Sequence, residues 1–135
     1  MLFLWLPTNT DAPVYHFPWA TLALIAANCL AFAAAASGQF PVEQWMLTSG
    51  HIAPLEWVTS NFLHVGFGHL LGNMFFLWSV GLIVEGKLGW KMFSLVYLGI
   101  GVTQCAIEQV CMLGAEGGSL GASSIVFGLA AMALV

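Results

Sequence analysis

The segment from Phe62 to Val84 constrains the fold more than any other part of this chain. It is almost wholly apolar and longer than the roughly 20 residues that a helix needs to cross a lipid bilayer. His64, His69 and Asn73 nevertheless stand within it. Polar side chains at membrane depth are costly and usually have a partner or a chemical role. This segment therefore predicts both a membrane helix and a candidate site.

The composition also indicates a membrane protein. Hydrophobic residues make up 60% of the 135 residues and charged residues 6%, whereas a soluble domain carries roughly 25% charged residues. The only two basic residues are Lys87 and Lys91, against six acids, so no basic patch could hold nucleic acid. The three cysteines stand in apolar segments without metal-ligand spacing. We expect a lipid-embedded protein with no cofactor, no metal and no nucleic-acid partner.

The apolar segments predict an all-α fold, a polytopic membrane helical bundle. We expect spans at about residues 19–36, 62–84, 92–113 and 119–135, which together form one transmembrane domain over residues 19–135. Residues 1–18 contain prolines and aromatic residues and are interpreted as an N-terminal interfacial segment. The connection over residues 37–60 is too polar and too broken by glycine and proline to span. The last span ends at Val135 without a cap or a flanking charge, so a C-terminal part is expected to be missing.

The two lysines predict the orientation. Lys87 and Lys91 bracket the turn expected after the second span. Basic residues favour the cytoplasmic side of membrane proteins. The turn and the N-terminus are therefore predicted to be cytoplasmic, and the 37–60 loop is predicted to lie on the opposite side.

Three polar side chains form the candidate site. At about 100° per residue, His69 and Asn73 lie roughly 40° apart on one helix face, whereas His64 lies roughly 140° from His69. His64 is therefore predicted not to join them, and a metal site of His64, His69 and Glu85 is rejected because the two histidines would point apart.

Ser123 is the third member, in the sequence Gly121-Ala-Ser-Ser124 that opens the fourth span. Backbone N–H groups and the helix dipole favour a developing anion there. By itself this motif is explained equally well as a stripe of small residues for helix packing, Gly121, Ser124 and Gly128. With His69 and Asn73 at a similar depth, it indicates an acyl-transfer site.

Gln104 and Glu108 share a face near the outer end of the third span. An acid within a membrane suggests a function by default. The position near the helix end instead favours an interfacial structural role.

Taken together, these motifs resemble those of the rhomboid family of intramembrane serine proteases. The matching positions are His64, His69, Asn73, Gly81, Glu85, Leu88, Gly89, Gly121, Ala122 and Ser123. The resemblance implies a rhomboid-like core of six helices, of which four are present. It implies that Ser123 is the nucleophile and that His69, Asn73 and the Ser123 N–H stabilise the oxyanion. It further implies an endopeptidase that cleaves transmembrane protein substrates with a Ser-His dyad, the histidine lying on the sixth helix, beyond residue 135.

Some positions qualify the resemblance. Trp57 is followed by Val58 where the family often has arginine, so the anchoring of this loop is expected to differ, and Ser124 stands where a second glycine is common. Phe127 matches the aromatic position on which the family packs its catalytic histidine. Without that base, residues 1–135 alone are expected to be inactive.

The sequence leaves two alternatives to the protease. One is a catalytically inactive rhomboid-like protein that binds membrane clients, which the histidine beyond residue 135 would decide. A channel or transporter is disfavoured, because the first span offers only Thr21 and Asn28 as polar groups to line a path.

Overall fold

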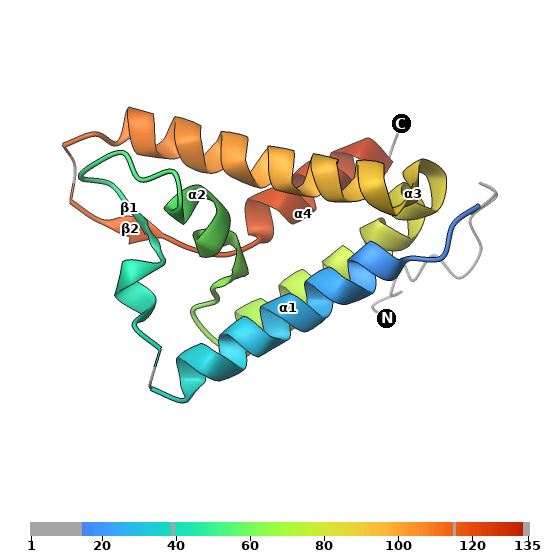
Figure 1. Cartoon of the computed structure of the whole chain (residues 1–135), viewed down its shortest axis with the longest axis horizontal. Helices are drawn as coiled ribbons and strands as arrows, with labels where there is room; N and C mark the ends of the chain where they lie inside the picture. The colour runs from blue at the N-terminus through green and yellow to red at the C-terminus, as the bar shows by residue number, and fades with distance from the viewer. Residues whose placement is uncertain (1–14, 39, 115, 134–135) are drawn as a thin grey trace, which may run out of the picture.

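The computed structural model describes residues 15–38, 40–114 and 116–133 (Figure 1). In these residues helices predominate, which confirms the predicted all-α class. The predicted interfacial segment, residues 1–18, falls mostly outside the described part. The elements in chain order are α1 (Trp19–Ala36), η1 (Val42–Gln44), β1 (Leu47–Thr48), α2 (Glu56–Thr59), η2 (Ser60–Phe62), α3 (Phe67–Cys111), β2 (Gly118–Ser119) and α4 (Ser123–Ala133).

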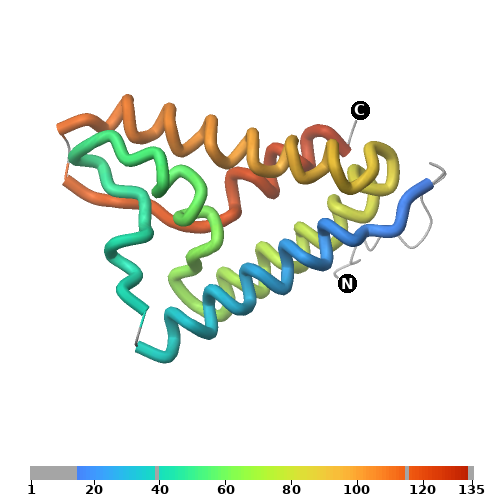
Figure 2. The backbone as a smooth tube through the Cα atoms, viewed as in Figure 1, coloured from blue at the N-terminus to red at the C-terminus, as the bar shows by residue number. Residues whose placement is uncertain are grey.

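Helix α3 consists of two helical arms that meet at Gly89. This glycine has φ 74° and ψ 162°, a conformation that residues with a side chain rarely adopt. The chain reverses its direction there (Figure 2). Each arm, residues 67–88 and residues 90–111, rises about 33 Å, which suffices for a hydrocarbon core of roughly 30 Å. The first arm continues past the predicted end of the span at residue 84, since Gly86 is still a buried helical residue.

The first arm begins later than predicted. The sequence suggested a helix from about Phe62, but the helix starts at Phe67. Residues 60–62 instead form the 3-10 turn η2, which the Leu63 N–H closes by donating to Ser60 O at 3.2 Å. Leu63 and Gly66 then have extended backbones. Helical spacing therefore does not apply before Phe67, which matters for His64.

The hydrophobic core is formed mainly by α4 and both arms of α3. Its buried members are Leu70, Met74, Leu77, Val80, Val84, Phe93, Tyr97, Ile125, Val126 and Leu129. Gly101 lets α4 approach the second arm closely, since a Cβ there would lie 2.7 Å from Ile125 Cδ1. This packing fixes the depth at which α4 begins.

Helix α1 runs beside the first arm of α3 and is capped by it (Figure 1). The fully buried Glu85 accepts hydrogen bonds from Ala20 N at 2.8 Å and from Thr21 N and Oγ1 at 2.7 Å each. A carboxylate at this place satisfies two otherwise unpaired N–H groups and complements the positive end of the α1 dipole.

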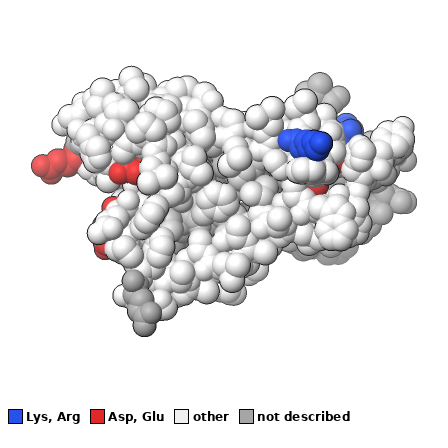
Figure 3. Space-filling model, in the orientation of Figure 1, with Lys and Arg blue, Asp and Glu red and all other residues white. Residues whose placement is uncertain are grey.

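The outer surface is suited to lipid. Within the described residues, α1 and α3 are long and apolar enough to cross a membrane. Large apolar side chains such as Leu30 and Leu95 are exposed on it. On the face drawn in Figure 3, charged atoms are few and lie towards the two ends of the molecule.

Candidate active site

Ser123 is the first residue of α4 and is half-buried. The helix begins there because Gly121, at φ 118°, turns the chain out of β2 and Ala122 O accepts the first helical bond, from Val126 N at 3.0 Å. The first N–H groups of a helix have no acceptor within it. The N–H of Ser123 therefore lies where an anion would be favoured.

The His69 ring lies directly against Gly121. A Cβ built on Gly121 would lie 2.8 Å from His69 Cε1 and 3.5 Å from Nε2. The imidazole therefore occupies the space that any other residue would need at position 121. The structure brings His69, on the first arm of α3, to the residue two positions before Ser123.

Asn73 follows His69 by one turn of α3 and is 8% exposed. Its Nδ2 is buried and has no hydrogen-bond partner among the described residues. A buried donor without a partner costs about 1–3 kcal/mol and is rare in folded proteins. Such a donor is suited to a ligand or a transient anion. The catalytic roles of Ser123, His69 and Asn73 stay predictions.

His64 does join His69, so the sequence-based exclusion was wrong. The centroids of the two imidazole rings lie 5.3 Å apart, edge to face. The error arose from applying helical spacing to a residue that precedes α3. The rejected metal site still lacks its third ligand, because Glu85 lies 16 residues beyond His69 on the helix, roughly 24 Å away, where it caps α1.

His64 is buried and its surroundings disfavour a positive charge. Its Nδ1 lies 3.4 Å from Phe62 O, and its Nε2 has no partner among the described residues. Burial lowers the pKa of His64, the hydrogen bond to Phe62 opposes this, and the neighbouring His69 lowers the pKa further. His64 thus presents a neutral ring to His69 at neutral pH.

A small polar cavity of about 110 Å³ adjoins Ser123 on the side of the second arm of α3. Gln104 and Glu108 line it, together with Ser123 and Ser124, and Gln104 Nε2 donates to Glu108 Oε2. Sequence reasoning gave these two residues an interfacial structural role. Their shared polar face was the available signal, but only the fold places that face beside the serines.

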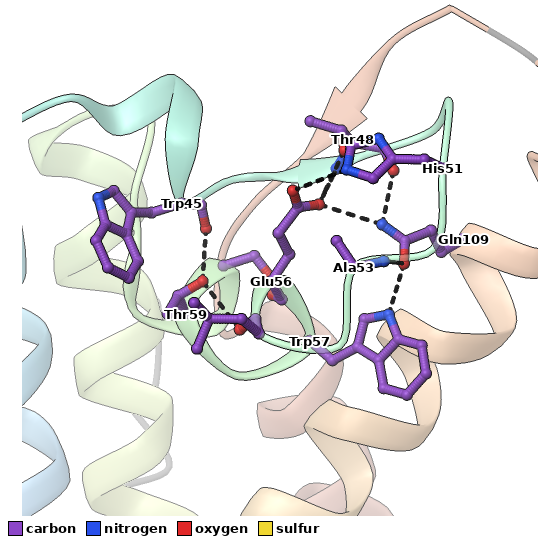
Figure 4. Close-up of polar contacts among 10 residues, drawn as sticks. Trp45, Thr48, His51, Ala53, Glu56, Trp57, Thr59 and Gln109 are labelled. Carbon is purple, nitrogen blue, oxygen red and sulfur yellow. Dashed lines mark hydrogen bonds and ion pairs between the residues drawn. The ribbon is translucent and has the colours of Figure 1, made fainter.

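Sequence reasoning missed the hydrogen bonds that hold the loop before α3 (Figure 4). The carboxylate of Glu56 accepts from Thr48 N and Oγ1 at 2.8 and 2.9 Å. Gln109, near the end of α3, accepts from Trp57 Nε1 at 2.7 Å. These bonds anchor the loop although Val58 stands where arginine was expected.

The chain is similar to known proteins of one family. The family model of the Rhomboid domain matches residues 51–135. A mitochondrial presenilin-associated rhomboid-like protein of Rattus norvegicus is 31% identical over 119 residues, covering 76% of this chain and 29% of the relative. Rhomboid protease GluP of Bacillus subtilis (strain 168) is 40% identical over 80 residues, covering 57% of this chain and 15% of the relative.

A third relative, Rhomboid-like protease 2 of Toxoplasma gondii, is 38% identical over 68 residues, covering 50% of this chain and 24% of the relative. The chain thus spans less than a third of the length of each of these three proteins.

Proposed function

Because this integral membrane chain belongs to the rhomboid family, we propose that it forms the Ser123-bearing part of an intramembrane serine endopeptidase that cleaves transmembrane protein substrates. The observation that supports this most is the contact of the His69 ring with Gly121, two residues before Ser123. Two of the relatives are named as proteases.

In the proposed reaction, Ser123 Oγ attacks the carbonyl carbon of the scissile peptide bond. The carbonyl oxygen becomes an oxyanion, which the Ser123 N–H, His69 and Asn73 stabilise. The unpartnered Asn73 Nδ2 supports this role, because the oxyanion would supply the hydrogen bond that this donor lacks. Collapse of the intermediate expels the amine of the substrate and leaves an acyl-enzyme, which water then hydrolyses.

A base must take the proton of Ser123 and later return one to the leaving amine. We place this base on a histidine that follows Val135 in the whole protein. Phe127 is 72% exposed, so its ring is free to pack against that histidine.

The proposed orientation places the N-terminus and the Gly89 turn in the cytoplasm. Both basic residues flank this turn, and Figure 3 draws the lysine atoms at one end of the molecule. Glu116 is exposed and stands two residues before β2, which lies at the end of the molecule away from the Gly89 turn (Figure 1). In a cysteine-free background, Glu116→Cys should react with an impermeant thiol reagent only from the side opposite the cytoplasm. Labelling from the cytoplasmic side alone would reverse the orientation.

A serine-directed fluorophosphonate tests the nucleophile in the whole protein. Ser123 should be labelled, and Ser123→Ala should lose both labelling and cleavage of a transmembrane substrate, whereas Ser124→Gly should keep both. Retention of cleavage by Ser123→Ala would exclude Ser123 as the nucleophile. An intact protein that binds membrane clients but neither labels nor cleaves would instead be an inactive rhomboid-like protein. Residues 1–135 alone should not be labelled.

A further inference from the structure

We propose that Gln109, acting with Glu56, is a positioning residue for Ser123. Gln109 fixes the loop of residues 47–62 to the end of α3, and this loop in turn holds Gly121. The inference rests on the proposed function in one respect, namely that Ser123 is the reacting group.

Gln109 uses its whole amide to hold the loop. The side chain is 1% exposed, and its Oε1 accepts from Ala53 N at 2.9 Å and from Trp57 Nε1 at 2.7 Å. Its Nε2 donates to Thr48 O at 2.8 Å and to Glu56 Oε2 at 3.1 Å. Figure 4 shows this amide bonded to Thr48, Ala53, Glu56 and Trp57. Since hydrogen bonds in a buried site are costly to leave unmade, this side chain specifies one position of the loop.

One route from Gln109 to the site runs through the small sheet. The backbone N–H and C=O of Thr48 are both bonded to side chains, those of Glu56 and Gln109. These two side chains therefore satisfy the backbone hydrogen-bonding groups of Thr48 on the edge of β1 that does not pair with β2. β1 pairs with β2 antiparallel, with Thr48 opposite Gly118. A shift of the side chains would move β2, which leads directly to Gly121.

The second route runs through α2 and η2. Ser60 Oγ donates to the backbone oxygen of Glu56 at 2.6 Å, and Ser60 O accepts from Gly121 N at 3.0 Å. Ser60 is 2% exposed, so neither bond is open to water. Both routes begin at the Glu56–Gln109 pair and end at residues 118–121.

If the loop of residues 47–62 were held less firmly, Ser123 would be affected through Gly121. It has φ 118° and lies in contact with His69. Because glycine has no side chain and many accessible backbone conformations, the conformation of Gly121 depends on the groups that hold it. Because catalysis is sensitive to displacements of about 1 Å, the orientation of Ser123 towards His69 depends on how firmly Gly121 is held.

Gln109→Met tests the inference, because it keeps the length of the side chain and removes all four hydrogen bonds. Hydrogen–deuterium exchange of single amides is measured by NMR in detergent micelles, on the whole protein. We expect the Gly121 N–H to exchange roughly 10- to 100-fold faster than in the wild type, with the amides of α1 within about threefold. Gln44→Met, at an exposed glutamine of η1, is the matched control and should change neither.

A second, milder variant keeps the inference testable if Gln109→Met does not fold. Trp57→Phe removes the hydrogen bond to Gln109 and keeps an aromatic ring, so we expect exchange at Gly121 to be about three- to tenfold faster. In the whole protein, Gln109→Met should lower kcat at least about tenfold and leave KM nearly unchanged, since orientation and not substrate binding is lost.

Two results would overturn the inference. One is unchanged exchange at Gly121 in both variants. The other is an increase that α1 shares equally, because Gln109 would then support only global stability. The exchange result does not require catalysis, so it decides the role of Gln109 in holding Gly121 even if the whole protein cleaves nothing and the proposed function fails.

Discussion

The Glu85 carboxylate joins two membrane helices through three hydrogen bonds, and its removal has a calculable effect. Its two oxygens accept from Ala20 N, Thr21 N and Thr21 Oγ1, all within 2.8 Å, and the residue is fully buried. Glu85→Gln keeps the size but replaces one acceptor by an NH2 group that faces a donor. A hydrogen bond to a charged group contributes about 1.5–3 kcal/mol, and an unpaired buried donor costs about 1–3 kcal/mol. We therefore expect the free energy of unfolding to fall by about 2–4 kcal/mol.

The partner substitution sharpens this prediction. Thr21→Val removes only the hydroxyl donor and should cost about 1 kcal/mol. The double variant should lose less than the sum of the two single variants by about 0.5–1 kcal/mol, because the hydroxyl bond requires the carboxylate. Glu116→Gln is the matched control at an exposed acid and should stay within about 0.5 kcal/mol of the wild type.

The assay is reversible unfolding in mixed micelles by titration with a denaturing detergent, followed by circular dichroism. If Glu85→Gln unfolded within about 0.5 kcal/mol of the wild type, the capping role would be refuted. Strict additivity with Thr21→Val would also contradict it, since the two side chains would then act independently.

Three further predictions concern the site and the corner of α3. Gly121→Ala should displace the His69 ring, because the new Cβ would lie 2.8 Å from His69 Cε1 and the backbone of Gly121 has φ 118°. The kcat of the whole protein should therefore fall at least about tenfold, and an unchanged kcat would contradict this packing. Burial lowers the pKa of His64 below the usual 6.5, so the unfolded state binds its proton at higher pH than the folded state. Stability should therefore fall as pH drops below about 6.5, and pH titrations of unfolding should show a smaller loss for His64→Gln. Gly89→Ala should lower the free energy of unfolding by about 1–3 kcal/mol, because alanine would have to adopt a backbone conformation that favours glycine. Gly99→Ala is the control: this glycine is helical and has open space around it, so the substitution should not lower stability in the same unfolding assay.

The sequence was sufficient for the features that depend on local composition. Long apolar segments with few charges predict membrane helices, because each backbone polar group must be satisfied within its own segment in lipid. This gave the confirmed all-α class, and the motifs around His69 and Ser123 gave the confirmed family resemblance. The turn expected between the second and third spans is also present, but the sequence did not predict that it is confined to Gly89.

Other features were decided only by tertiary contacts. The start of α3 at Phe67, and hence the meeting of His64 with His69, follows from a loop that folds back as η2. Gln109 reaches Thr48 across 61 residues of sequence, and no periodicity within either segment encodes that distance. Hydrophobic patterns report which face of a segment is buried, whereas a hydrogen bond between distant segments requires both to be brought into one geometry by the packed core. Local sequence patterns were therefore enough to predict the helices and the candidate polar residues, whereas only the packed fold shows which loop holds Gly121 against His69.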